Sequence, residues 1–243
     1  MIKIKSEILS ALAGEGAVLI RFVDVRGLSA NQNRGLPNAI FFGLPLCPSY
    51  VRTVMETPGY VEQVITGSRV EEDEFHLTER RAGEVADRIA DKLRTCGYLA
   101  YSQSDPNLMA TGGWDEASSG TLLPHKTIAV LAGAGWIGKN NLLITPEYGA
   151  ALCIGTILTD APLDTSQPRV MENICGACKR CYAICPTRAL AGKTWEKNIS
   201  RETIIDIRKC TTCMKCLLHC PYTQKYIRQH EDNPIRISQS FPM

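Results

Sequence analysis

The sequence has no apolar run that approaches the roughly 18–20 residues needed to cross a bilayer. Its N-terminal segment, MIKIKSEILSALAGEG, scatters charge through a short apolar pattern, so we expect no secretory signal and a cytoplasmic location. Histidine is scarce, with four residues dispersed along the chain, which favours surface or structural roles over metal ligation. These four are His76, His125, His219 and His230.

Familiar nucleotide and catalytic signatures are also missing. We find no phosphate-binding loop, no serine nucleophile elbow and no D-x-H-x-x-G cobalamin signature. The nearest approach to G-x-G-x-x-G is GAGWIG, residues 133–138, but it follows a predicted helix and precedes a predicted strand. A dinucleotide fingerprint requires the opposite order, so the sequence does not predict that type of site.

Cysteine, by contrast, is concentrated in two matched runs. Eight of the 11 cysteines lie in CGACKRCYAICP, residues 175–186, and CTTCMKCLLHCP, residues 210–221. Both read C-x2-C-x2-C-x3-C-P, and the total is too sparse for a disulfide scaffold in a chain of 243 residues. The spacing therefore indicates metal ligation in a reducing compartment.

The repeated run resembles that of bacterial two-cluster ferredoxins, over roughly residues 171–228. In those proteins the first three cysteines of a run hold one cube, and the fourth ligates the other cluster. The pattern thus predicts two [4Fe–4S] clusters. The first set is Cys175, Cys178, Cys181 and Cys220, and the second set is Cys210, Cys213, Cys216 and Cys185. Zinc sites with four cysteines are the rival, although their C-x2-C pairs are normally separated by a longer loop.

Net charge is small overall but divided unevenly. Residues 1–170 carry 15 Lys+Arg against 19 Asp+Glu, a net of −4, whereas residues 171–243 carry 12 against 6, a net of +6. Anionic clusters account for part of that basic excess, and a solvated basic face is an equal alternative. A weaker hypothesis is tRNA binding through basic side chains. The candidates are Arg201, Arg208, Lys209, Lys225, Arg228 and Arg236.

Hydrophobic periodicity predicts a layered α/β or α+β arrangement before the cysteine runs. We expect helices over 3–13, 71–95 and 123–133, and strands over 17–25, 37–46 and 97–104. Residues 105–121 are polar and glycine-rich and are expected to form a functional or disordered loop. LLIT, a PEYG turn and AALCIGTILTD predict a β-hairpin.

A second motif, AGAGWIGKNNLLITPEYGA at residues 132–150, is followed by a cysteine run that ends in CPT-x-AL. Together they resemble epoxyqueuosine reductase, a family that uses cobalamin and two [4Fe–4S] clusters and is related to reductive dehalogenases. The resemblance implies a nitroreductase-like α/β (α+β) domain over residues 1–170. It also implies a small ferredoxin-like domain with two [4Fe–4S] clusters over residues 171–243.

The same resemblance implies a cofactor site. The implied residues are Gly135, Trp136, Gly138, Lys139 and Asn140, which would form the wall of a cavity beside the proximal cluster. Glycines permit close backbone approach to a bulky planar ligand. The alternative is that the glycines only turn the chain from helix to strand and that Trp136 is core. The expected cofactor is cobalamin, without a histidine ligand from the protein, and FMN is the second choice.

One departure from the family bears on the reaction. The family places a catalytic aspartate 17 residues before this tryptophan, and counting back from Trp136 reaches Ser119. Serine cannot replace a carboxylic acid of tuned pKa, so no catalytic residue is assigned. We therefore expect an oxidoreductase that acts on another substrate. It would receive its electrons from a donor protein such as reduced ferredoxin or flavodoxin. The alternative is an electron carrier or activator that binds no organic cofactor and docks a redox partner.

Overall fold

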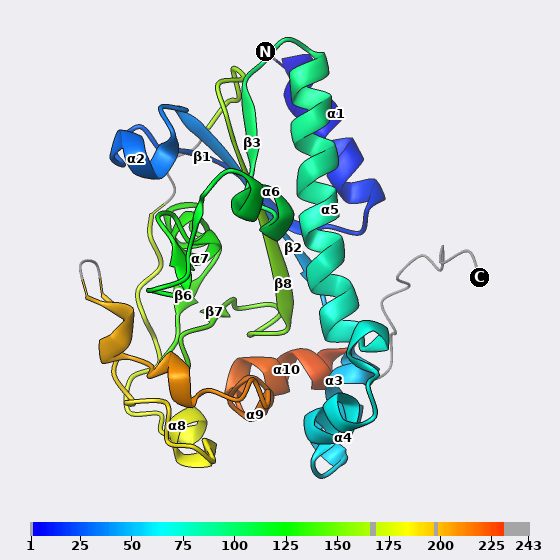
Figure 1. Ribbon diagram of the computed structural model, residues 1–243, viewed down its shortest axis with the longest axis vertical. Coiled ribbons are helices and arrows are strands. Elements are labelled where there is room, and N and C mark those ends of the chain that lie inside the picture. Colours follow the sequence, from blue (N-terminus) through cyan, green and yellow to red (C-terminus); the bar gives the residue numbers. More distant parts are fainter. Residues whose placement is uncertain (1, 166–168, 197–198, 231–243) are drawn as a thin grey trace. The chain divides into compact units, whose positions relative to one another are not determined.

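The computed structural model describes residues 2–165, 169–196 and 199–230 (Figure 1). Arg236, one of the basic residues considered for tRNA binding, lies outside the described residues. No helix among the described residues is long and apolar enough to span a membrane.

The described residues divide by their contacts into two compact units. The first, here called the sheet unit, draws on residues 1–44, 78–134 and 153–170. The second, here called the cysteine unit, draws on 45–77, 135–152 and 171–243. One boundary between them falls between residues 170 and 171, where the sequence predicted a domain boundary, but the cysteine unit also takes in two earlier segments. The two-domain division at that point stays a prediction.

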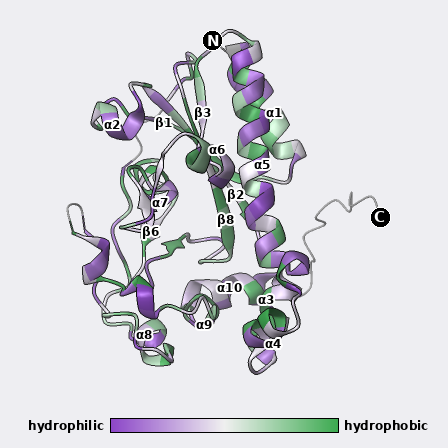
Figure 2. Ribbon diagram, in the orientation of Figure 1, coloured by the Kyte–Doolittle hydropathy of each residue, from purple (hydrophilic) through white to green (hydrophobic). Residues whose placement is uncertain are grey.

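The sheet unit contains a four-stranded sheet in the order β1-β2-β8-β3. Its strands are β1 (Val18–Asp24), β2 (Asn38–Pro45), β3 (Ala100–Ser102) and β8 (Leu152–Thr159). The β1–β2 and β3–β8 pairs are antiparallel. Seven of the eight residues of β2 are buried, as expected for a central strand covered on both faces. Figure 2 shows that hydrophobic residues predominate along β2 and β8.

Helices α1 (Ile2–Gly14) and α5 (Glu74–Thr95) lie side by side. Arg88 and Glu15 form an ion pair of 2.8 Å between them, and Lys92 lies 3.6 Å from Glu7. The buried positions of α5 repeat at helical spacing, which confirms the amphipathic helix read from the sequence. They are Ala82, Val85, Ala86, Ile89, Ala90 and Leu93. The other helices here are α2 (Ala30–Asn33), α6 (Asp105–Ala110) and α7 (His125–Leu131).

Two predictions of local structure were wrong. Residues 105–121 are not one loop: Ser104 caps α6, and β4 (Trp114–Asp115) pairs with β5 (Gly120–Thr121). The predicted hairpin also pairs differently, because β7 (Leu143–Ile144) pairs with β6 (Trp136–Ile137). The apolar strand β8 instead joins β3 in the sheet. Burial of β8 in the sheet overrode the local turn signal, which survives as a single bridge between Thr145 and Gly149.

The cysteine unit is built mainly from short helices. The sequence did not predict α3 (Pro48–Glu56) or α4 (Tyr60–Thr66), which precede the 3₁₀ turn η1 (Val70–Glu72). Its later elements lie within, between and after the two cysteine runs. They are α8 (Arg180–Ile184), η2 (Arg201–Thr203), η3 (Ile207–Lys209), α9 (Lys215–Leu218) and α10 (Pro221–Gln229).

Candidate iron–sulfur site and adjoining cavity

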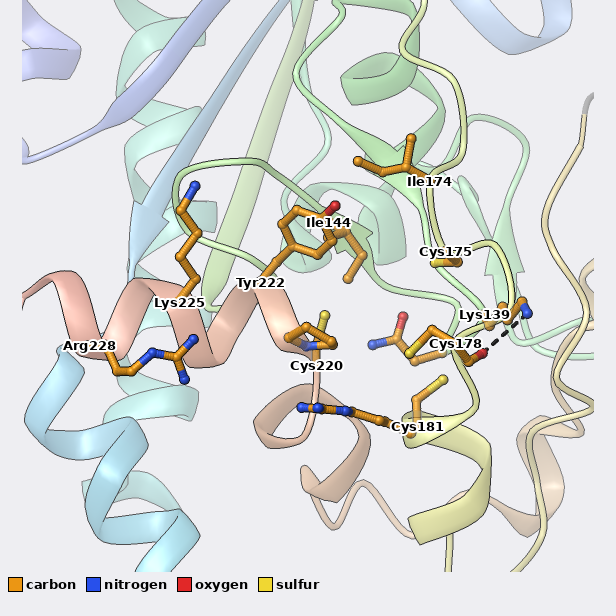
Figure 3. Close-up of a pocket in the computed structure, with 13 residues that line it drawn as sticks. Lys139, Ile144, Ile174, Cys175, Cys178, Cys181, Cys220, Tyr222, Lys225 and Arg228 are labelled. Carbon is orange, nitrogen blue, oxygen red and sulfur yellow. Dashed lines mark hydrogen bonds between the residues drawn. The ribbon is translucent and has the colours of Figure 1, made fainter.

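The first cysteine set surrounds one cavity of about 440 Å³ (Figure 3). Cys175 and Cys178 lie on a tight turn in which the Cys178 N–H donates to the Cys175 carbonyl at 2.9 Å. Cys181 follows on α8, and Cys220 stands immediately before α10. The fold therefore brings the last cysteine of the second run to the first three of the first run. That arrangement fits a cube with one thiolate per iron, and the assignment of ligands stays a prediction.

Three thiols of the second cysteine set lie close to one another. Cys210 and Cys213 both act electrostatically on Cys216, which places these three thiols near one another. Cys185 and Cys216, together with Cys181 of the first set, pack against the small apolar cluster of Ala189, Leu190 and Ile205. Cys210 is exposed, whereas Cys220 of the first set is buried. The second set is thus the nearer of the two to solvent.

Burial controls the protonation of these thiols before iron binds. It raises the pKa of Cys216 to about 12 and that of Cys181 to about 11, with neighbouring cysteines contributing further. These side chains therefore hold their protons at neutral pH and release them when a metal takes the thiolate. No group of three described His, Cys, Asp or Glu side chains is placed to share one metal ion, whereas a [4Fe–4S] cube takes one thiolate at each iron.

The two cysteines that end the runs receive hydrogen bonds at sulfur. Burial opposes ionisation of Cys185, but bonds from the Thr187 hydroxyl and from the backbone N–H groups of 187, 189 and 190 outweigh it and lower its pKa. Burial raises the pKa of Cys220, partly offset by the N–H groups of Tyr222 and Thr223 at the start of α10. A proline follows each of these cysteines and redirects the chain. After Cys220 this proline begins α10, so the first N–H groups of the helix can donate to the sulfur.

The GWIGKN motif holds both cysteine runs. The Lys139 ammonium donates to the carbonyl oxygens of Gly176 at 2.6 Å and Cys178 at 3.2 Å. The Asn140 amide donates to the carbonyl of Cys216 at 3.4 Å. Lys139 and Asn140 also line the cavity. Two residues adjacent in sequence therefore fix one loop of each cysteine set.

The other three residues of the predicted cofactor wall are placed differently. A Cβ at Gly135 would lie 2.0 Å from the carbonyl oxygen of Ile144, and one at Gly138 would lie 2.6 Å from Asn140 Oδ1. Both glycines thus serve the close β6–β7 pairing, and neither lines the cavity. Trp136 is buried, with its ring 4.9 Å from that of Tyr222. This placement favours the turn-and-core alternative for these three residues, while a role in cofactor binding stays a prediction.

Trp136 carries the buried side-chain polar atom, Nε1, that has no hydrogen-bond partner among the described residues. An unpaired buried N–H costs about 1–3 kcal/mol. A hydrogen-bond acceptor from a bound ligand or ordered water would remove that cost, so this atom is compatible with a cofactor beside the motif.

The structure contains a buried polar centre around Asp73 that the sequence pattern does not predict. Its carboxylate accepts hydrogen bonds from the hydroxyls of Tyr50 at 2.9 Å and Tyr60 at 3.0 Å. The Tyr50 hydroxyl also lies 3.8 Å from the sulfur of Met214, the residue after Cys213. This centre joins α3, α4 and the start of α5 to the second cysteine run. Nothing in the sequence pattern marks a tyrosine–aspartate contact between separate helices.

In the sheet unit, His125 belongs to a continuous set of hydrogen bonds. Gln103 donates to the Leu123 carbonyl, the Thr156 hydroxyl donates to Gln103 Oε1 at 2.9 Å, and His125 Nδ1 lies 2.6 Å from Thr156 Oγ1. Because the Thr156 proton goes to Gln103, Nδ1 must carry the proton that His125 donates. Burial lowers the pKa of His125 to about 4 and keeps the ring neutral.

Ser119, which the count back from Trp136 predicts to stand at the family's aspartate position, lies in the β4–β5 turn with a φ of 47°. The neighbouring Asp115 carboxylate accepts hydrogen bonds from Ala117 N–H and from the Ser118 hydroxyl. These bonds lower the pKa of Asp115. An ionised carboxylate bound to its own turn is poorly suited to donate a proton, so Asp115 does not take over the missing role.

Comparison with known proteins agrees with this geometry. A family model described as a 4Fe-4S dicluster domain matches residues 174–223, which include both cysteine runs in full. The chain resembles epoxyqueuosine reductases. It is 35% identical over 128 residues to the enzyme of Gloeobacter violaceus, covering 53% of this chain and 35% of the relative. It is 29% identical over 173 residues to that of Lactococcus garvieae, covering 65% of this chain and 44% of the relative.

Solved structures show the same fold over most of the chain. Epoxyqueuosine reductase from Streptococcus thermophilus superposes with a TM-score of 0.56 at 16% identity, covering 90% of this chain and 66% of that one. The catabolic reductive dehalogenase NpRdhA gives a TM-score of 0.64 at 17% identity, covering 92% of this chain and 33% of that one. The chain spans less than half the length of the two curated relatives above.

Proposed function

We propose that this chain is an iron–sulfur oxidoreductase that delivers electrons through two [4Fe–4S] clusters to an organic cofactor. A corrinoid is the first choice and a flavin the second. The observation that carries the proposal is that all four cysteines of the first set line one cavity together with residues of the GWIGKN motif and α10. Its volume of about 440 Å³ falls in the range of small-molecule sites.

The exposure of the cysteines supports a direction for the electrons. The second set includes the exposed Cys210, and Arg208 and Lys209 precede it directly, so an acidic donor such as a reduced ferredoxin or flavodoxin would be attracted to this side. The first set, with buried Cys220, adjoins the cavity. Electrons would thus pass from the second cluster to the first and then to the cavity.

A bound corrinoid or flavin would supply the low-potential reducing chemistry, while the protein supplies position and electrostatics. Lys139 and Asn140 keep both cysteine loops in place. Ile144, Ile174 and Tyr222 give the cavity an apolar wall that limits water around the reduced group. The nitroreductase-like assignment of the sheet unit belongs to this proposal, and the four-stranded sheet with its covering helices is compatible with it.

The substrate is proposed to differ from epoxyqueuosine. Relatives are named for that reaction, and one solved epoxyqueuosine reductase holds a modified tRNA stem loop. Here, however, Ser119 occupies the aspartate position, and Asp115 is committed to its own turn. These residues suit a substrate whose reduction needs no carboxylic acid as proton donor at the position of Ser119. A tRNA substrate is retained as the weaker hypothesis.

The alternative is an electron carrier or activator that docks a redox partner and binds no organic cofactor. The exposed position of Cys210 and the basic residues beside it favour that reading. Anaerobic purification with cobalamin supplied separates the two. Recovery of about eight irons, with an additional corrinoid or flavin band reduced by dithionite, supports the enzyme. Eight irons without an organic band support the carrier, and zinc in place of iron contradicts both.

A further inference from the structure

The cavity beside the first cysteine set is lined by cations that the proposed function does not yet use. Four of its lining residues are Lys or Arg, and none is Asp or Glu. The Lys139 ammonium already donates hydrogen bonds to two backbone carbonyl oxygens. Lys225 and Arg228 have no hydrogen-bond or ion-pair partner among the described residues. These two and Arg180, which also has no hydrogen-bond or ion-pair partner among the described residues, therefore line the cavity as cations without a described counter-charge.

Helix α10 carries two of these cations and one aromatic ring of the cavity lining. Lys225 follows Tyr222 by three residues and Arg228 follows Lys225 by three, so each neighbouring pair is adjacent on the helix, while Tyr222 and Arg228 are about 120° apart around it. The opposite face is buried through Thr223, Tyr226 and Ile227, which fixes the rotation of the helix. Figure 3 shows Tyr222 and Lys225 rising from the same side of α10, with Arg228 farther from Cys220.

Neutralisation of the first cluster does not account for both cations. Lys225 and Arg228 follow Cys220 by five and eight residues, which corresponds to roughly 8 and 12 Å along a helix. Charges at that separation are substantially screened at physiological ionic strength, where the Debye length is about 8 Å. Their position suits an anionic group held away from the cysteines, at the end of a ligand that reaches toward them.

We propose that Lys225 and Arg228 clamp the phosphate of a planar organic ligand whose ring system lies against Tyr222, beside the first cysteine set. Arginine and lysine are the usual phosphate ligands, and an aromatic face beside them favours a flat ring. The proposal rests on the proposed function and assigns to its organic cofactor a chemical class, a phosphate ester on a ring system, and the residues that hold it. Flavin mononucleotide and cobalamin both belong to that class.

Two pairs of probes isolate the contribution of phosphate. Flavin mononucleotide is compared with riboflavin, and cobinamide phosphate with cobinamide, because the two members of each pair differ only in the phosphate. Binding to the cluster-loaded protein is measured by anaerobic equilibrium dialysis, without any reductant. The variants are the double variant Lys225→Gln/Arg228→Gln and two single variants, Tyr222→Leu and Tyr222→Phe. The matched control is Lys193→Gln, an exposed lysine of the same unit that does not line the cavity.

In at least one pair the phosphate-bearing member should bind about tenfold more tightly or better. That preference should disappear in the Lys225→Gln/Arg228→Gln protein and persist in Lys193→Gln. Tyr222→Leu should weaken both members of the pair, whereas Tyr222→Phe should not. Equal binding within both pairs, or no binding by any of the four probes, overturns the proposal. So does a short RNA hairpin that binds through the two cations while neither pair is discriminated.

This experiment separates failure of the clamp from failure of the proposed function. Dialysis without reductant reports on the ligand site alone, while iron content and the dithionite-reduced spectrum report on the clusters. A protein with about eight irons and no phosphate preference would retain its clusters and lose the clamp.

Discussion

The ammonium of Lys139 lies 2.6 Å from the carbonyl oxygen of Gly176, inside the loop that carries Cys175 and Cys178. This contact joins the GWIGKN motif to the first cysteine run across 37 residues of sequence. Its neighbour Asn140 reaches the carbonyl of Cys216 in the second run. The motif that the sequence resemblance predicted as a cofactor-binding wall therefore also holds both cysteine loops in place. It also brings a positive charge close to the first cysteine set.

Replacement of Lys139 by Gln should make the first cluster harder to reduce. A nearby positive charge favours the reduced, more negative state, so its loss should lower the potential by roughly 40 mV, the one-electron equivalent of about 1 kcal/mol. A redox titration followed by electron paramagnetic resonance measures this shift. Lys139→Arg should restore most of the potential, and Lys193→Gln should leave it unchanged. An unchanged potential in Lys139→Gln would show that this ammonium acts only on loop structure.

Paired cysteine variants should show how the two runs share their ligands. If Cys175 and Cys220 hold the same cluster, Cys175→Ala/Cys220→Ala should lose no more iron than either single variant and keep about four irons. Cys175→Ala/Cys185→Ala should lose both clusters, because it removes one ligand from each set. Iron and sulfide analysis after anaerobic reconstitution gives the count. The reverse result, with four irons kept only in Cys175→Ala/Cys185→Ala, would mean that each run holds its own cube.

The sequence was informative where chemistry or periodicity is local. The spacing of the cysteines predicted a module with two [4Fe–4S] clusters, and the 4Fe-4S dicluster model matches those residues. The helical repeat of apolar residues predicted α5. It was uninformative where a contact joins distant segments. Helix α3 has few strong helix formers and is held by Tyr50, whose partner Asp73 lies 23 residues away. Lys225 and Arg228 appeared only as part of a basic segment, because their common face depends on which side of α10 is buried.

The two glycines of GWIGKN illustrate the same difficulty. Glycine allows close approach of any backbone atom, and the sequence cannot say whether that atom belongs to a ligand or to the protein. At Gly135 it is the Ile144 carbonyl of the adjacent strand.

Gly135→Ala should therefore destabilise the protein even before any cofactor is considered. The added Cβ would lie 2.0 Å from the Ile144 carbonyl oxygen, so β6 and β7 must separate. We expect a loss of about 2–4 kcal/mol in the free energy of unfolding, comparable to severe overpacking. Denaturant unfolding measures it. Gly27→Ala, where a Cβ meets nothing within 4 Å, is the matched control and should be nearly neutral. Equal stability of the two variants would contradict the tight β6–β7 contact.

The pH dependence of stability should reveal the neutral His125. Its folded-state pKa of about 4 lies below the ordinary value of 6.5, so the unfolded chain binds the proton more readily. The contribution of this group to stability is therefore present above pH 6.5 and is lost as the pH falls toward 4. Between pH 7 and pH 5 the expected loss is about 2 kcal/mol.

The measurement is the difference between wild type and His125→Gln, taken by denaturant unfolding at both pH values, so that acid effects on the clusters cancel. Glutamine can still donate to Thr156 but does not titrate in this range, so the variant should lose about 2 kcal/mol less than wild type on acidification. His230→Gln is the control, because His230 lies in the cysteine unit at the end of α10, outside this hydrogen-bonded set. If wild type and His125→Gln lose the same stability between pH 7 and pH 5, then His125 is not held neutral by burial.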